Sequence, residues 1–159
     1  MYKRQGWGQN NGVLSIAAVQ SGGSLAYDST EGIAIAAVDA TQNVLYYTNK
    51  PAGMPFRSPD PVYGEGTGGW YPSLGVDPMF HEPAIAFYVC SAQNNKNPSQ
   101  CNDADDKVVV AQRIEGNWRL ETVTEEGANL IRMAFLPNGK RAIAYREKKT
   151  GALKLAVEK

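Results

Sequence analysis

The sequence lacks an excess of charge of either sign, and it lacks a long hydrophobic run. Its 159 residues hold 16 Lys and Arg against 16 Asp and Glu, so the formal net charge is zero. A balanced surface gives no electrostatic reason to expect nucleic acid or an anionic membrane as a partner. The longest apolar runs, such as residues 33–38, fall far short of the ~20 residues that a membrane-spanning helix needs. The sequence therefore predicts neither a nucleic-acid partner nor a membrane span.

Histidine, cysteine and helix-forming patterns are also scarce. The chain has one histidine and two cysteines, too few for the usual zinc sites. Sixteen Gly, nine Pro and eight Tyr indicate many turns and many short strands. Apolar residues make up 43% of the chain, which is enough for a buried core and excludes wholesale disorder. The composition predicts an all-β domain or a run of three or four small repeats.

The two cysteines, Cys90 and Cys101, lie in one polar loop with ten residues between them. A disulfide between them would pin this loop, contribute about 2–3 kcal/mol by the loop-entropy model, and favour an oxidising compartment. Two unpaired surface thiols in a cytosolic protein are the alternative. We predict the disulfide, and with it a secreted, periplasmic or cell-surface location.

The tripeptide Ala-Ile-Ala occurs three times, beginning at Ala34, Ala84 and Ala142, and marks an internal repeat. A strand-like segment and a turn precede each copy. A polar turn and a further apolar strand follow each copy, and the second copy is followed by a fourth strand as well. Four short antiparallel strands per unit at a period near 50 residues are typical of β-propeller blades.

We therefore predict a partial β-propeller of about three four-stranded antiparallel blades over residues 13–159. The units span about residues 20–63, 69–124 and 129–159. Four prolines between residues 51 and 61 weaken the fourth strand of the first unit, because Pro cannot donate to the strand ladder, although an edge strand tolerates it. A β-sandwich built from the same strands is the alternative.

Residues 34–38, 84–88 and 142–145 are expected to be the equivalent central strands of the three units. Because side chains alternate along a strand, the isoleucine of each copy should lie on one buried face. We expect burial of Ile35, Ile85 and Ile143.

The segments that carry the repeat resemble a known family. They read Gly-Trp-Tyr-Pro-Ser-Leu at 69–74, Pro-Ala-Ile-Ala-Phe-Tyr at 83–88 and Gly-Asn-Trp-Arg-Leu-Glu-Thr-Val at 116–123. They are similar to secreted, mostly bacterial β-propeller repeat proteins with sialidase-like or lectin-like folds. The resemblance covers about residues 13–159 and is weak for activity, because such repeats serve many roles. The sialidase Asp-box, Ser-x-Asp-x-Gly-x-Thr-Trp, is not matched at residues 28–32, which counts against a true sialidase.

Residues 1–12 form a tail outside the repeats. Residues 1–5, Met-Tyr-Lys-Arg-Gln, resemble the translation of a sequencing-library adapter, and an ordinary polar tail is the alternative. The first and last units would each present one apolar sheet face to water, which favours association. We therefore expect a fragment of a longer propeller, whose partners are further blades of the same chain or other copies.

Two aromatic residues, Trp70 and Tyr71, are the predicted ligand-binding residues. They follow a Gly-rich run at a boundary between a loop and a strand, where propellers place ligands. Trp118 instead recurs as a strand residue of the repeat, and we expect it to pack between blades.

Acidic and histidine side chains give weaker predictions. Asp103, Asp105 and Asp106 are weak Ca²⁺ candidates because alternating oxygen ligands suit that ion, but the EF-hand spacing is absent and a solvated loop is the alternative. No other cofactor is expected. His81 beside Glu82 could be an acid/base pair, but neighbours on an extended turn point apart and no motif places a nucleophile near them.

The sequence favours a non-catalytic binding or structural propeller segment with a carbohydrate or protein ligand. The alternative is a fragment of a propeller-type, sialidase-like glycoside hydrolase. That alternative requires clusters of arginine and acidic residues, and the chain offers Arg57, Arg113, Arg132 and Arg146 without a shared motif. A third possibility is a short propeller that assembles itself, with two or more copies closing one ring.

Overall fold

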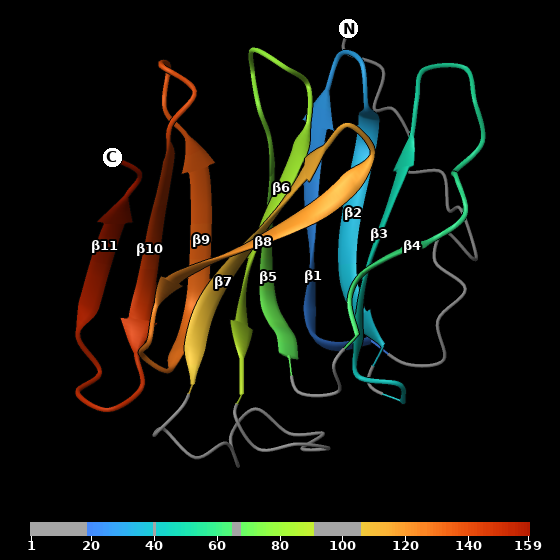
Figure 1. Ribbon diagram of the computed structural model, residues 1–159. Helices are drawn as coiled ribbons and strands as arrows, with labels where there is room; N and C mark the ends of the chain where they lie inside the picture. Colours follow the sequence, from blue (N-terminus) through green and yellow to red (C-terminus); the bar gives the residue numbers. More distant parts are fainter. Residues whose placement is uncertain (1–18, 40, 65–67, 91–105) are drawn as a thin grey trace, which may run out of the picture.

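The computed structural model describes residues 19–39, 41–64, 68–90 and 106–159, and these residues form eleven β-strands and no helix. The strands make three sheets, each an antiparallel meander in which every strand pairs with its neighbour along the chain. Figure 1 shows the sheets side by side, from the blue first sheet to the red third sheet. The all-β prediction is confirmed.

The first sheet contains, in order, β1 (Val19–Asp28), β2 (Gly32–Asp39), β3 (Val44–Lys50) and β4 (Asp60–Tyr63). Asp28 and Asp39 end two of these strands. Their side chains accept backbone N–H bonds of 2.7 Å from the turns that follow, which fixes the reversal of the chain. The last strand, β4, is short and carries Pro61 at the sheet edge, where proline is tolerated.

The second sheet contains β5 (Gly68–Val76), β6 (Pro83–Val89), β7 (Lys107–Ile114) and β8 (Asn117–Thr124). Every residue of β6 is buried, because neighbouring sheets cover both of its faces. Glu115 and Gly116 join β7 to β8 with φ angles of 51° and 82°. Two consecutive positive φ angles are typical of the tight turns that connect antiparallel strands.

The third sheet contains only three strands, β9 (Ala128–Phe135), β10 (Arg141–Glu147) and β11 (Leu153–Val157). The prediction of four strands per unit therefore holds for the first two sheets and is not met by the third within the described residues. The three sheets form an open row and not a closed ring (Figure 1).

One register repeats in all three sheets. The second strand of each sheet pairs with the first through the same kind of apolar pair, namely Leu25 with Ile35, Leu74 with Ile85, and Met133 with Ile143. The central strands predicted from the Ala-Ile-Ala tripeptides are β2, β6 and β10. The repeat in the sequence is therefore a repeat in strand pairing.

The sheets meet through a recurring joint between their first strands. The backbone N–H of Leu74 in β5 donates to Ser24 Oγ in β1 at 2.9 Å, and the N–H of Met133 in β9 donates to Ser73 Oγ in β5 at 2.8 Å. Ser24 and Ser73 each precede the leucine of the repeated pair. The same hydrogen bond thus links the first sheet to the second and the second to the third.

Burial of the three repeated isoleucines differs. Ile85 and Ile143 lie in the core as predicted, because the preceding sheet covers them. Ile35 is only half-buried, so its predicted burial is wrong. The cause is its place on the outer face of the first sheet, which no other sheet covers among the described residues.

Candidate functional site

Trp70 is completely buried at the start of β5, where its ring packs against Tyr88 with centroids 6.1 Å apart. A buried indole offers no face to an external sugar, so the structure places Trp70 in the core. The preceding Gly69 has a φ of 90°, and a Cβ there would lie 2.6 Å from Cβ of Leu45. Tyr71 is half-buried, and its role in ligand binding stays a prediction.

Trp118 packs between the first and second sheets, as predicted. Its ring meets Tyr47 edge-on with centroids 5.4 Å apart, and its Nε1 donates to Asp60 Oδ2 at 2.9 Å. An aromatic contact of this kind adds about 0.5–1.5 kcal/mol to the burial of the rings. Trp118 therefore holds β8 against β3 and β4.

The predicted disulfide and calcium ligands lie mostly outside the described residues. Cys90 is buried at the end of β6, but Cys101, Asp103 and Asp105 are not described. The disulfide therefore stays a prediction, which a count of free thiols in denatured, unreduced protein tests. Within the described part of the chain, no group of three His, Cys, Asp or Glu side chains is placed to hold a metal ion.

Asp106 is completely buried and joins the second sheet to the third. Its Oδ2 accepts a hydrogen bond from the hydroxyl of Tyr88 and lies 3.4 Å from Lys148 Nζ. The same ammonium group sits 5.3 Å from the centre of the Tyr88 ring. A buried carboxylate needs such a positive partner, and this pairing gives Asp106 a structural role.

His81 pairs with Asp28 rather than with Glu82. Its Nδ1 lies 2.9 Å from Asp28 Oδ2, so a turn of the second sheet is tied to a turn of the first. Burial raises the pKa of the Asp28 carboxyl, but hydrogen bonds from the backbone of Glu31, from His81 and from the backbone of Thr30 together lower it. The arrangement links two turns, and no nucleophile of the described residues bonds to the histidine.

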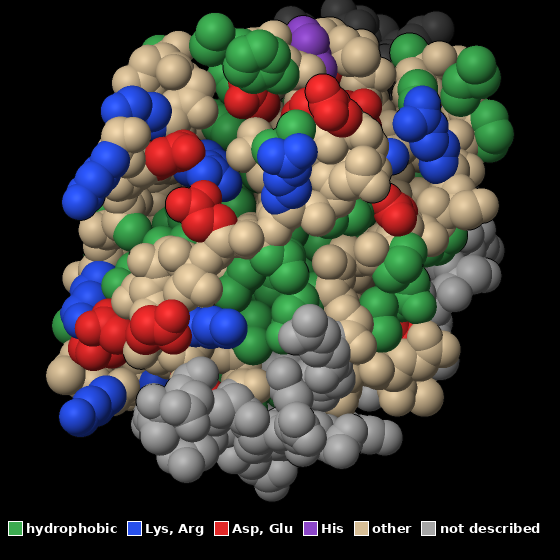
Figure 2. Space-filling model, viewed as in Figure 1, with side chains coloured by type: hydrophobic (Ala, Val, Ile, Leu, Met, Phe, Trp, Pro, Cys, Tyr) green, Lys and Arg blue, Asp and Glu red, His purple; other side chains and the backbone are tan. Residues whose placement is uncertain are grey.

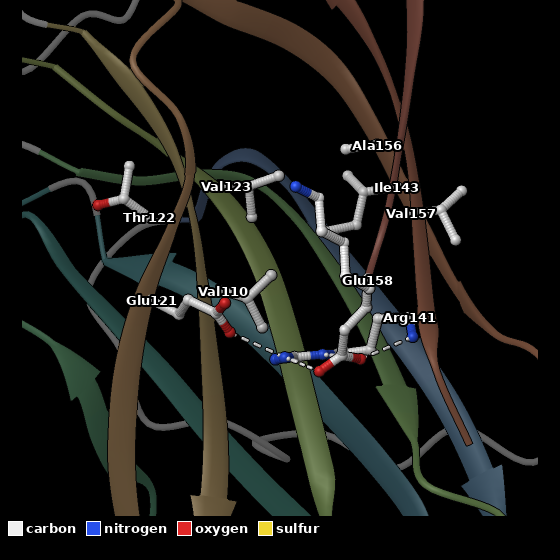
Figure 3. Close-up of a pocket in the computed structure, with 10 residues that line it drawn as sticks. Val110, Glu121, Thr122, Val123, Arg141, Ile143, Ala156, Val157 and Glu158 are labelled. Carbon is white, nitrogen blue, oxygen red and sulfur yellow. Dashed lines mark hydrogen bonds and ion pairs between the residues drawn. The ribbon is translucent and has the colours of Figure 1, made fainter. Parts of the chain in front are cut away.

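Two clefts open between neighbouring sheets. We call the cleft between the first and second sheets the first cleft, and the cleft between the second and third sheets the second cleft. The second cleft has a volume of about 300 Å³ (Figure 3). It is lined by Val110, Glu121, Thr122, Val123, Arg141, Ile143, Ala156, Val157, Glu158 and Lys159. The first cleft, between the first and second sheets, has a volume of about 430 Å³. It is lined by Tyr47, Thr48, Asn49, Arg57, Ser58, Pro59, Asp60, Arg113 and Gly116.

The charge in the second cleft is internally balanced. Arg141 donates from Nη2 to Glu158 Oε1 at 2.6 Å and to Glu121 Oε2 at 2.8 Å, and from Nε to Glu158 Oε2 at 3.0 Å. The hydrogen bonds to Glu158 raise the pKa of Arg141 and lower the pKa of Glu158. Figure 2 likewise shows basic and acidic side chains lying beside one another over the third sheet. Arg141 is therefore fully paired, whereas Lys159, the other cation that lines this cleft, forms no ion pair within the described residues.

The acidic groups around the first cleft are already engaged. Glu31 Oε2 accepts hydrogen bonds from the Tyr47 hydroxyl and from Asn49 Nδ2, both at 2.8 Å. Burial raises the pKa of the Tyr47 hydroxyl, and the Glu31 carboxylate raises it further. Asp60 accepts from Trp118, as described above.

The two arginines of the first cleft are not balanced in this way. Arg57 and Arg113 form no ion pair with any carboxylate of the described residues, and the buried Nε of Arg113 has no hydrogen-bond partner there. Both arginines line the cleft, and their positive charges oppose the rise in the pKa of the Tyr47 hydroxyl. Two guanidinium groups without a direct ion pair thus share one polar cleft with the carboxylate of Asp60.

The backbone holds Arg57 in place. Its N–H donates to the carbonyl of Asn49 at 2.9 Å, and its carbonyl accepts from Thr48 Oγ1 at 2.6 Å. Arg113 extends from β7, opposite Trp118 in the register with β8. The two arginines belong to different repeat units, so only the stacking of sheets brings them together, and no local sequence pattern predicts it.

No protein-family profile, curated protein or solved structure matches this chain. In the described part of the chain, no helix of the length and apolarity that a membrane crossing requires is found.

Proposed function

We propose that this chain is a non-catalytic binding segment of a β-propeller, and that its first cleft binds an anionic group of a carbohydrate or protein ligand. The repeated strand register and the repeated serine joint support the propeller, because both are what equivalent blades around one axis would share. The predicted disulfide at Cys90 supports secretion to the periplasm, the cell surface or the medium.

The observation that carries the proposal is the pair of arginines without an ion pair, Arg57 and Arg113. Arg57 is exposed and Arg113 is half-buried, so the cost of a partly buried guanidinium without an ion-pair partner applies to Arg113, and an incoming carboxylate or sulfate would remove that cost. Guanidinium groups bind such oxyanions through paired, charge-assisted hydrogen bonds. The first cleft is therefore suited to an acidic ligand.

Of the other lining groups, Ser58 is exposed and offers a hydroxyl to a ligand. Tyr47 and Asn49 also line the cleft, but they are buried and already bonded to Glu31. The volume of about 430 Å³ lies within the usual range for small-molecule sites. We infer that an acidic sugar, or an acidic side chain of a protein ligand, is the bound group.

Binding to a glycan array that presents acidic glycans and their neutral counterparts tests the proposal. We expect binding to the acidic glycans only. The variants Arg113→Gln and Arg57→Gln should each weaken it about tenfold or more, since hydrogen bonds between charged groups contribute about 1.5–3 kcal/mol. Arg119→Gln, an exposed arginine of β8 that does not line the cleft, is the control and should bind normally. Equal binding of neutral glycans, or unchanged binding by both cleft variants, would disprove the proposal.

One observation favours the hydrolase alternative, namely the hydrogen bond of Tyr47 to Glu31 beside the two arginines. Some sialidases use a tyrosine nucleophile. Two facts oppose that role here. The Tyr47 side chain is buried, and its raised pKa disfavours the phenolate. Turnover of a fluorogenic sialoside separates the two functions: we expect none, and turnover that Tyr47→Phe abolishes would establish the hydrolase.

A further inference from the structure

The two ends of the row of sheets display the residue types that the internal joints bury. In each internal joint, the later sheet contributes the repeated apolar pair, and the second strand of the earlier sheet contributes two alanines, Ala34 and Ala36 or Ala84 and Ala86. The outer face of the first sheet carries the repeated apolar pair, like the covered face of a later sheet. The outer face of the third sheet carries two alanines of the second strand, like the covered face of an earlier sheet.

The outer face of the first sheet matches the covered face of the second. Leu25 is 68% exposed, whereas its counterpart Leu74 is 6% exposed beneath the first sheet. The register places Leu25 opposite Ile35 and Tyr27 opposite Ile33, so all four side chains share this outer face. Tyr27 and Ile33 are exposed as well. This face therefore has the composition of one that another sheet covers.

The outer face of the third sheet matches the opposite side of the joint. Ala142 and Ala144 in β10 correspond to Ala84 and Ala86 in β6, whose small side chains let the next sheet approach closely. Leu155 pairs with Ala144 and is 67% exposed, whereas Val110 pairs with Ala86 and is 1% exposed. Leu153 and Val157 extend the same exposed apolar face.

We propose that a second copy of this chain covers both ends: the third sheet of each copy packs on the first sheet of the other, and the two copies close a ring of six sheets. A single chain carries both halves of the joint on opposite ends, where they cannot meet. Such head-to-tail contacts form a ring when the rotation closes, and six sheets lie within the usual range of 4–8 for closed propellers. The inference rests on the propeller architecture proposed above, but not on ligand binding.

The joint between copies differs from the internal joints in one respect. In the third sheet, Arg132 stands where Ser24 and Ser73 stand in the first two. A guanidinium cannot accept a hydrogen bond, so the backbone N–H of Leu25 finds no serine partner there. Apolar contact alone then holds the copies together, and we expect the pair to dissociate on dilution.

Sedimentation equilibrium over a range of concentrations tests the ring. The unmodified chain should reach twice its mass of 17.2 kDa and no more. Leu25→Glu and Leu155→Glu each place a charge on one of the two faces that meet in every joint between copies. Each variant alone should therefore be a monomer. Leu120→Glu changes a leucine of β8 that is 49% exposed and lies outside both end faces, and this control should pair like the unmodified chain. Circular dichroism shows whether each variant keeps its strands.

An unmodified chain that stays at single mass would overturn the proposal, and so would an open series of larger assemblies. Persistence of the pair in either variant would show that like faces associate. An equimolar mixture of folded Leu25→Glu and Leu155→Glu chains retains one intact joint and should recover a pair at high concentration, which like-with-like pairing does not predict. Because the first cleft lies within one chain, single-mass Leu25→Glu should still bind acidic glycans, so failure of the ring and failure of the proposed function are distinguishable.

Discussion

The interface between the first and second sheets resembles the interface between the second and third sheets near the first strand of each sheet, but the two interfaces differ near the outer strands. Near the first strands, both use a serine hydroxyl that accepts a backbone N–H. Toward the outer strands, the second–third interface is tied by Arg141 and by the buried pair of Asp106 and Lys148, whereas the first–second interface leaves arginines unpaired. The repeat thus determines the joint near the first strands, and charge pairing at the periphery distinguishes a structural cleft from a candidate binding cleft.

The difference has an energetic meaning. Buried charges that are paired favour one packing arrangement, whereas an unpaired charge costs stability unless a ligand neutralises it. Proteins commonly retain such locally unfavourable groups at functional sites. The contrast between Arg141 and Arg113 is therefore evidence about function as well as about stability.

The largest expected effect is at Asp106. Asp106→Asn removes the buried negative charge that faces Lys148, so the free energy of unfolding should fall by about 3–5 kcal/mol. Chemical denaturation measures it. Lys154→Ala is the control: its ammonium group pairs with Glu126 and Glu147 but is over one-third exposed, so solvent screens both pairs and the loss should be much smaller. Equal losses in the two variants would contradict the structural role of Asp106.

Ile85 and Ile35 test how far a covering sheet stabilises one repeated position. Ile85→Ala should cost about 2–5 kcal/mol, because the cavity opens between the first and second sheets. Ile35→Ala removes the same atoms from a half-buried position. In the Leu155→Glu variant, which is expected to be a monomer, its loss of unfolding free energy should be less than half that of Ile85→Ala. Denaturant midpoints compare the pair directly. Similar losses at both positions would mean that another segment covers Ile35 in solution.

Arg141 and Arg113 compare the two clefts directly. Arg141→Gln removes charge-assisted hydrogen bonds to two glutamates and should cost about 1.5–3 kcal/mol. Arg113→Gln removes an unpaired charge and no ion pair of the described residues, so without ligand it should leave stability unchanged or raise it by no more than about 0.5 kcal/mol. Thermal denaturation of both variants measures the contrast. A large loss for Arg113→Gln would indicate a structural partner and would weaken the case for a binding site.

The sequence predicts the strands better than it predicts the site, and for a physical reason. Strand identity follows from alternation and turn residues within a few positions, so the Ala-Ile-Ala tripeptides locate β2, β6 and β10 correctly. Burial of Trp70 and partial exposure of Ile35 depend on which sheet lies next to them, and no short-range pattern encodes that. Arg57 and Arg113 meet only because two sheets stack. The site is therefore a property of packing between repeats.

The smallest expected effect is the response of the second cleft to acid. The hydrogen bond to Arg141 lowers the pKa of Glu158 below its ordinary value of 4.5, although partial burial opposes the shift. A carboxyl whose pKa is lower in the folded state stabilises the fold above its ordinary pKa, and this stabilisation is lost as the pH falls through the lowered value. Unmodified protein should therefore lose melting temperature below pH 4.5 more steeply than Glu158→Gln, which has no carboxyl to protonate. Because Glu158 is 38% exposed, solvent screens the pair and the difference should stay below about 1 kcal/mol. If the melting temperatures of the two proteins changed in parallel with pH, Arg141 would not hold Glu158 in its charged form, and only Glu121 would then pair with Arg141 in the second cleft.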